Sequence, residues 1–288
     1  MEYFIHLAIL IGIYIPLAVS LNLVVGYTGL LSVTHAAFYG IGAYATAILM
    51  TSFGFSFFPA VLIGIVLAGA IALLLGFILS RFKDDYYALV SFGFNIIIYS
   101  ILLNWESLTR GPLGIPGIPR PAFFGFELSS NLSFLILTVV GAGIIYLISL
   151  GITKSSFGRV LKGIREDEKA LSVFGYNTKL FKLTIFIITA GMAGFAGGLF
   201  ATYITFIDPS TFGLNESIFI LAIIILGGMA SLRGSVLGAI FLILLPEILR
   251  FVGFPTDIAA QMRQMVYGAL LVFLMLYRPQ GLVGEYKL

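Results

Sequence analysis

The sequence contains no cysteine and few charged residues. Without cysteine, the 288-residue chain can hold no disulfide, no thiolate metal site and no cysteine nucleophile. Charged residues make up 10% of the chain and hydrophobic residues 60%, whereas about a quarter of the residues in a soluble domain are charged. This composition excludes a soluble globule, and we expect the lipid bilayer to be the main solvent of the chain.

Motifs of enzyme and cofactor sites are absent as well. The sequence has no phosphate-binding loop, no HExxH and no nucleophile elbow. The two histidines, His6 and His35, are expected near opposite surfaces, so they predict no metal site. The net charge of +3 comes from basic residues beside apolar runs, where positive charge records topology. We therefore expect no enzyme activity, no cofactor and no nucleic-acid partner.

Apolar runs long enough to cross a bilayer occur along the whole chain. We predict an all-α polytopic membrane protein with about nine transmembrane helices (eight to ten), some glycine-broken or re-entrant, in a single domain of residues 1–288. The predicted spans are Tyr3–Val25, Val33–Thr51, Pro59–Ser80, Tyr86–Asn104, Leu132–Gly151, Leu183–Phe206, Glu216–Ala230, Ser235–Val252 and Met262–Tyr277. The seventh and eighth are short and separated by four residues, so a re-entrant hairpin is an alternative there.

Lysines and arginines are distributed unevenly between the two predicted sides. If the polar segment 153–182 is cytoplasmic, alternation of the spans places twelve of them inside and four outside. The four outside are Arg110, Arg120, Arg250 and Arg263. Because cytoplasmic loops are enriched in positive residues, we predict that the N-terminus lies outside and the C-terminus in the cytoplasm.

The outer connection, residues 105–131, is rich in proline and glycine. Pro112, Pro116, Pro119 and Pro121 alternate with glycines, and proline removes backbone donors while glycine adds backbone freedom. This pattern excludes regular helix over the first half of the connection. Two readings stay open: a surface loop, or a structured external lip that receives a partner or covers a translocation path.

Glycine clusters break or line several spans. Gly191, Gly194 and Gly198 place small residues on one face of the sixth span, which favours close approach of another helix. Residues 24–44 and 225–241 each combine an apolar span, a glycine-rich break and a small-residue span. They are a weak candidate for a parallel internal repeat with both breaks at the cytoplasmic face, an organisation found in transporters.

Five polar residues are expected at membrane depth: Asn22, His35, Asn95, Glu216 and Glu247. Such residues are costly in lipid and mark functional paths. For His35, a local hydrogen bond or a packing role is the simpler interpretation. Glu216 is expected to act at the start of a helix, where a carboxylate suits the helix dipole. Glu247 either pairs with Arg250 or faces a polar path.

Segment 153–182 is the one long polar interval, with seven basic and three acidic residues. Apolar residues recur within it at helical spacing, opposite a charged face. The apolar residues are Phe157, Val160, Leu161, Ile164, Leu171 and Phe174, and the charged face holds Arg159, Lys162, Glu166 and Lys169. Ser155 or Ser156 can cap the start of this amphipathic helix and Gly175 its end.

This amphipathic helix needs a surface for its apolar face. A helix of under about twenty residues is marginal alone in water. It can lie on anionic lipid headgroups as an interfacial helix, or it can insert into a cytoplasmic protein partner. The acidic triplet Glu166, Asp167 and Glu168 favours the protein, because anionic lipid repels acids.

Several stretches resemble one transporter family. The runs SLNLVVGYTGLLSVTHAAFYGIGAYATAIL, GRVLKGIREDEKALSVFGYNTKLFKLTIFIITAGMAGFAGGLFA and LGGMASLRGSVLGAIF, with the tail YRPQGLVGEY, look like the permease subunits of branched-chain amino-acid ABC importers, in particular the LivM-like branch. The resemblance covers nearly the whole chain, and its second run is the most specific.

The resemblance implies partners and residue roles. A second homologous permease subunit, two cytoplasmic ATPase subunits and an extracytoplasmic substrate-binding protein would assemble with this chain in a prokaryotic plasma membrane. The segment GRVLKGIREDEKAL would be the coupling helix seated in a groove of the ATPase. The residues implied in ATPase coupling are Gly158, Arg159, Leu161, Arg165, Glu166, Asp167 and Gly175. The candidates for the translocation path are Asn22, Gly26, Gly29, His35, Gly40, Asn95 and Glu247.

The leading functional hypothesis is therefore the membrane subunit of an ATP-driven importer of a small polar substrate, branched-chain amino acids being the family's usual cargo. A self-sufficient secondary carrier or channel is the alternative, motivated by Asn22, Asn95 and Glu247 and by the possible repeat. A secondary carrier usually places several ionisable groups at mid-membrane, and this chain is sparse there.

Overall fold

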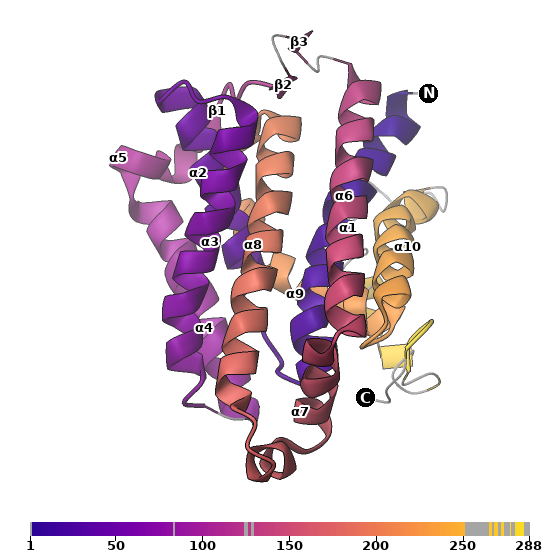
Figure 1. The fold of residues 1–288 in the computed structure, drawn as a ribbon. Coiled ribbons are helices and arrows are strands. Elements are labelled where there is room, and N and C mark those ends of the chain that lie inside the picture. Colours follow the sequence, from indigo (N-terminus) through magenta and orange to yellow (C-terminus); the bar gives the residue numbers. More distant parts are fainter. Residues whose placement is uncertain are drawn as a thin grey trace.

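The computed structural model describes residues 2–82, 84–123, 126–127 and 130–250, with short pieces between 265 and 284. Within these residues the chain is all α, as predicted (Figure 1). The long helices are α1 (Glu2–Thr28), α2 (His35–Ser52), α3 (Phe57–Leu79), α4 (Asp84–Asn104), α6 (Asn131–Lys154), α7 (Ser156–Val173), α8 (Thr178–Ile204), α9 (Leu214–Gly227) and α10 (Leu232–Arg250). The short elements are α5 (Glu106–Thr109), η1 (Gly111–Leu113), η2 (Pro209–Phe212), β1 (Ile115–Pro116), β2 (Ala122–Phe123), β3 (Phe126–Glu127) and β4 (Phe206–Ile207).

Five of these helices are long and apolar enough to cross a membrane: α1, α3, α4 from Tyr86, α6 and α8. They match the predicted first, third, fourth, fifth and sixth spans. The predicted second span is the helix α2, and the seventh and eighth correspond to α9 and α10, which meet at 119° across a short break. The ninth, Met262–Tyr277, lies outside the continuously described residues, so the count of nine stays a prediction.

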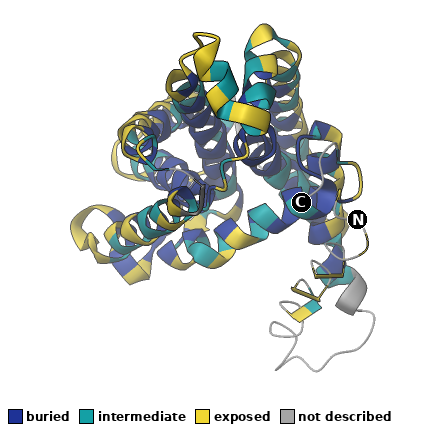
Figure 2. Ribbon diagram, turned by 90° about the horizontal axis from the view of Figure 1, so that it is seen from below, coloured by how far each residue is buried: buried dark blue, intermediate teal, exposed yellow. Residues whose placement is uncertain are grey.

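Burial separates central helices from outer ones. Over their apolar windows α1 is 72% buried and α8 67%, whereas α3 is 33% buried and α4 and α6 are 28% buried. Seen from below in Figure 2, buried residues gather on the sides of the helices that face one another. Outward-facing side chains such as Leu62, Val66 and Leu74 of α3 are large and apolar. Lipid is the solvent that suits such a surface.

The predicted glycine stripe on α8 is confirmed as a close-packing surface. A Cβ at Gly42 of α2 would lie 2.2 Å from the carbonyl oxygen of Gly194 on α8. A Cβ at Gly197 would lie 2.1 Å from the carbonyl oxygen of Tyr39. On the α3 side, the nearest neighbour of a Cβ at Gly191 is Ile65 and that of one at Gly198 is Val61. Small residues therefore let α2 and α3 approach the backbone of α8.

We expect Gly42→Ala to destabilise the protein and Gly93→Ala to leave its stability unchanged or raise it by up to about 1 kcal/mol. The added methyl group at Gly42 would overlap backbone atoms of α8, and overpacking of this kind costs about 1–3 kcal/mol or more. No atom lies within 4 Å of the corresponding position at Gly93 in α4. Thermal denaturation of the two purified variants in detergent compares them directly, and equal melting temperatures would contradict the packing.

The connection after α4 departs from one prediction. Regular helix was excluded over the first half of residues 105–131, yet α5 forms one helical turn at Glu106–Thr109. The prolines begin only at Pro112, so the amide of Thr109 is free to donate to the Trp105 carbonyl at 2.9 Å. Beyond η1, β1 pairs antiparallel with β4, Ile115 opposite Ile207. This pairing ties the connection to the chain that follows α8.

The two broken regions lie at the same end of the bundle, as the possible parallel repeat requires. The first break, residues 29–34, follows α1, and the second, residues 228–231, follows α9. The amide of Ala230 in the second break donates to the side chain of Asn22, in the last two turns of α1. We call this end, where α7 also lies, the α7 end (Figure 1).

Candidate functional site

The polar segment forms the helix α7, and its ends are built as the sequence indicates. The Ser155 hydroxyl accepts from the amide of Gly158 at 3.3 Å and so caps the start. Gly158 also packs closely, because a Cβ there would lie 2.4 Å from the Ile152 carbonyl oxygen. Past the end, Gly175 has φ +86°, and the amide of Tyr176 donates to the Leu171 carbonyl. Glycine readily adopts this left-handed conformation.

The helix is interrupted where a single helix was predicted. Asp167 has φ −153° and ψ 95°, outside the helical region. Its side chain accepts a hydrogen bond from the amide of Ala170 at 3.0 Å, the arrangement of an aspartate that starts a helix. α7 therefore consists of a first part up to Glu166 and a shorter second part that Asp167 starts.

The apolar face of α7 packs mainly against this chain's own helices. Leu161 is fully buried and Ile164 is 5% exposed, in a cluster with Leu23 and Tyr27 of α1 and with residues of α6 and α8. Burying each such side chain stabilises by about 1.5–3 kcal/mol. The expectation that this face docks on lipid or on a partner is therefore wrong for Leu161 and Ile164, because the helix ends of the bundle already cover them.

Polar contacts hold α7 to the bundle as well. The guanidinium of Arg165 donates to the Gly26 carbonyl of α1, and the ammonium of Lys162 lies 5.5 Å from the ring centre of Tyr27. Further along, the carboxylate of Glu168 pairs with Lys182 of α8 at 2.7 Å. These contacts join α7 to the end of α1 and to the start of α8.

The second part of α7 leaves apolar side chains uncovered. Val173 is 86% exposed, Phe174 79% and Tyr176 46%. We call these three residues the tip surface. Arg159, Glu166, Asp167 and Lys169 are exposed as well. Exposed apolar side chains bordered by charges are typical of a protein interaction site.

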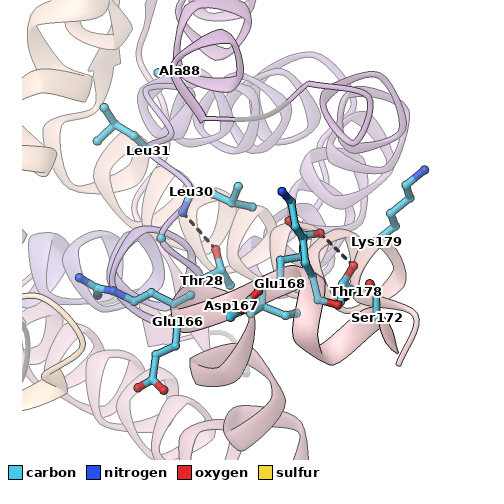
Figure 3. Close-up of a pocket in the computed structure, with 14 residues that line it drawn as sticks. Thr28, Leu30, Leu31, Ala88, Glu166, Asp167, Glu168, Ser172, Thr178 and Lys179 are labelled. Carbon is cyan, nitrogen blue, oxygen red and sulfur yellow. Dashed lines mark hydrogen bonds between the residues drawn. The ribbon is translucent and has the colours of Figure 1, made fainter. Parts of the chain in front are cut away.

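Beside α7 lies a cleft of about 880 Å³. One wall of the cleft is formed by the end of α1 and the first break, Thr28 to Leu31. The other wall is formed by α7 and the start of α8, with Ile164 to Lys169, Ser172, Thr178 and Lys179. Ala88 of α4 also lines the cleft. Figure 3 shows the break and the acidic residues of α7 on opposite sides of this space. Arg165 of α7 reaches across to the end of α1, where it bonds to the Gly26 carbonyl. It also packs against Gly29, where an added Cβ would lie 3.2 Å from the Arg165 Cγ.

Asn22 joins α1 to the second break, and we call its set of bonds the Asn22 clasp. The side-chain oxygen accepts from the amide of Ala230 at 2.9 Å. The side-chain nitrogen donates to the Ser235 hydroxyl at 2.6 Å and to the carbonyls of Ser231 at 3.0 Å and Gly228 at 3.3 Å. Asn22 is fully buried, so in this conformation it holds two segments together rather than facing an open path.

His35 is the first residue of α2, and Asn95 of α4 bonds to the break just before it. The Nε2 atom of His35 lies 2.8 Å from the Ser20 hydroxyl of α1, which is the local hydrogen bond expected for it. The amide nitrogen of Asn95 donates to the Val33 carbonyl at 2.8 Å and to the Ser217 hydroxyl of α9 at 2.5 Å. Both side chains are at most 1% exposed. These bonds fix the first break against α4 and α9.

The other predicted path residues are also in packed positions. A Cβ at Gly26 would lie 2.5 Å from the Ala230 amide nitrogen, and one at Gly40 would lie 2.9 Å from Phe212. Glu247 is half-buried in α10 after Pro246. The side chain of Arg250, its proposed partner, lies outside the described residues. Their role in a path stays a prediction.

Sequence reasoning missed the hydrogen-bond partner of Glu216. Glu216 lies in the first turn of α9, where it was expected, and its carboxylate also accepts a hydrogen bond from the Tyr14 hydroxyl of α1 at 2.6 Å. The two residues are 202 positions apart, so no local sequence pattern predicts this hydrogen bond. The polarity of Glu216 within an apolar run was the available signal.

The sequence is similar to known transport proteins over almost its whole length. Residues 3–275 match the family model described as the permease component of branched-chain amino acid transport systems. The high-affinity branched-chain amino acid permease protein LivM of Escherichia coli K12 is 36% identical over 97% of this chain and 69% of its own length. The probable LivM of Methanocaldococcus jannaschii is 24% identical, over 95% of this chain and 91% of its own length.

A second type of permease matches too. The LivH permease protein of Escherichia coli K12 is 25% identical over 94% of this chain and 91% of its own length. No solved structure matches the chain. The family model spans almost all of the chain and the LivM similarity covers the bundle and α7 alike. This chain therefore belongs to the family of branched-chain amino acid transport permeases.

Proposed function

We propose that this chain is the transmembrane subunit of an ATP-driven importer and forms half of the path for branched-chain amino acids or a similar small polar substrate. Family membership supports a transport role. The observation that carries the ATP-driven part is α7, a helix anchored by its buried face that presents the tip surface away from the bundle. A subunit whose conformation is changed by a separate ATPase needs such an anchored and exposed element to contact that ATPase.

The proposed partners meet the chain at opposite ends. Two ATPase subunits dock at the α7 end, where Arg159, Glu166 and Asp167 are exposed on α7 together with the tip surface. Within α7, Gly158 and Gly175 shape the two ends, Leu161 anchors the helix, and Arg165 transmits its movement to Gly26. A substrate-binding protein meets residues 105–131 at the other end, and a second homologous permease supplies the other half of the path.

The α7 end is cytoplasmic in this proposal, in a prokaryotic plasma membrane, with the N-terminus outside and the C-terminus inside. Two groups of residues support that assignment. Arg81, Arg233 and the basic residues of α7 lie at the α7 end. Arg120 lies at the other end, donating to Asn131, which in turn donates to Glu2. The positive residues thus gather where cytoplasmic loops carry them.

We expect a thiol at position 169 to be reachable only from the cytoplasm. The chain has no cysteine of its own, so Lys169→Cys and Leu113→Cys each create the only thiol in this subunit. Lys169 is exposed in α7 and Leu113 is 82% exposed at the other end. In intact cells a membrane-impermeant maleimide should label Leu113→Cys alone, and permeabilisation should expose Lys169→Cys. The reverse pattern would invert the topology.

Reconstitution tests the proposed function itself. The complete complex in liposomes, with ATPases, second permease and binding protein, should accumulate leucine only when ATP is present on the α7 side. The chain alone, without ATPases, should carry no gradient-driven flux. Gradient-driven flux through the chain alone would replace this proposal by the secondary carrier.

A further inference from the structure

The helix α9 begins in the middle of the bundle rather than at its surface. Tyr14, the partner of Glu216, is the thirteenth of the 27 residues of α1. It therefore lies about 18 Å from one end of α1 and about 21 Å from the other, at 1.5 Å per residue. Before α9, Phe212 of η2 packs against the rings of Tyr39 and Tyr44 of α2. The chain from β4 to α9 thus re-enters the bundle and turns at mid-depth.

A carboxylate and an exposed amide are found at this turn. Asn215 is exposed and Glu216 is half-buried. No lysine or arginine in the described part of the chain pairs with Glu216, and Tyr14 is its hydrogen-bond partner there. Charged and amide groups at this depth are costly against lipid and normally face a polar path or another subunit. This side of α9 therefore does not face lipid.

Capping α9 does not account for Glu216. A carboxylate used as a cap accepts from amides of the first helical turn, but the bond of Glu216 is made to the hydroxyl of α1. A second polar group lies next to η2: the ring of Tyr39 packs against Phe212, and its hydroxyl is buried without a hydrogen-bond partner in the described residues. This region therefore combines a carboxylate with two tyrosine hydroxyls.

We propose that Glu216, positioned by Tyr14, lines the translocation path at mid-depth and binds the ammonium group of the amino-acid substrate as it passes. This inference rests on the proposed function and adds the residue that meets the substrate. An ammonium group brings three donors and the opposite charge, which match a carboxylate that has one neutral partner. The exposed side of Asn215 then belongs to the water-filled part of the path.

Neutralising the carboxylate should impair transport while leaving the complex intact. In the reconstituted complex we expect Glu216→Gln to lower ATP-driven leucine uptake at least about 10-fold. Glu216→Asp, which keeps the charge, should retain more uptake than Glu216→Gln. Glu2→Gln, at an exposed acid at the start of α1, should match the parent. Glutamine can still accept from Tyr14, so uptake within about twofold of the parent for Glu216→Gln would overturn the proposal.

The accessibility of position 215 to a water-soluble reagent provides a second test, because a purely structural role of Glu216 does not require water at this position. In the assembled complex, a charged water-soluble thiosulfonate should modify Asn215→Cys, the sole thiol of this subunit. It should leave Ile97→Cys, at a 55% exposed position of α4 expected to face lipid, unmodified. Absence of modification at position 215, both with and without ATP, would overturn the proposal.

The two tests separate this proposal from the proposed function. If the parent complex takes up no amino acid, the proposed function fails. Labelling of Asn215→Cys still shows whether this side of α9 is accessible to water. If the parent transports and Glu216→Gln transports equally well, the proposed function stands and the role of Glu216 falls.

Discussion

ATP-driven uptake should fall to background when Val173 and Phe174 are both replaced by aspartate. Both side chains are largely exposed, so the folded bundle should keep its stability. Burying two such side chains against a partner contributes roughly 3–6 kcal/mol, which corresponds to a loss of about 10²-fold to 10⁴-fold in ATPase affinity for the double variant. Copurification of the ATPase subunits and uptake in liposomes measure the two consequences.

The matched control for the tip surface is Leu113→Asp. Leu113 is 82% exposed but lies at the opposite end of the bundle, so its replacement should leave ATPase copurification unchanged. If the double variant copurified with the ATPase as well as the parent does, the tip surface would not be the docking site.

Replacing Asn22 by leucine should cost about 3 kcal/mol or more of stability and abolish transport. Asn22 bonds four groups of residues 228–235. Leucine has a similar size but leaves the Ala230 amide and the Gly228 carbonyl unpaired, and each unpaired buried group costs about 1–3 kcal/mol. The Ser231 carbonyl and the Ser235 hydroxyl keep the bond between them. Because the clasp lies in the turn next to Gly26, which Arg165 contacts, its loss should also separate α7 from the second break. Thermal denaturation and uptake measure the two effects.

Asn104→Leu provides the control for the clasp. Asn104 is an exposed asparagine whose side chain donates to the Ser100 carbonyl within α4. Its replacement removes one solvent-exposed bond and should change neither the melting temperature nor uptake. An Asn22→Leu variant as stable as Asn104→Leu would show that the four bonds contribute nothing to the break.

Features determined by local sequence could be predicted. The two ends of α7 follow from Ser155 and Gly175, whose preferences act within a few residues. The close approach at α8 follows from the spacing of Gly191, Gly194 and Gly198. The alternation of spans follows from apolar runs and positive residues, and the described helices keep it. These signals are short in range, so the sequence alone contains them.

Features determined by distant residues could not be predicted. The apolar face of α7 was visible, but part of its cover is formed by residues more than a hundred positions away, such as Leu23 and Tyr27 of α1. Similarly, the polarity of Asn22 and Glu216 identified them as unusual, whereas their partners lie 202 or more positions along the chain. Periodicity gives the face of a helix but not what covers it.

The interruption at Asp167 was missed for a different reason. The acidic triplet was interpreted by its charge, as an argument against a lipid partner. The same aspartate is a strong helix-starting residue, and in the structure it accepts from the Ala170 amide. Phe174, predicted on the apolar face of this helix, lies just past the last residue of α7 and is 79% exposed as part of the tip surface.

The most direct test is a photo-cross-link from position 174. A benzoylphenylalanine in place of Phe174, irradiated in the assembled complex, should form an adduct with an ATPase subunit, and the same group at position 113 should form none. If position 174 gave no adduct with the ATPase in an assembled, transporting complex, α7 would not be the element through which ATP hydrolysis drives this chain.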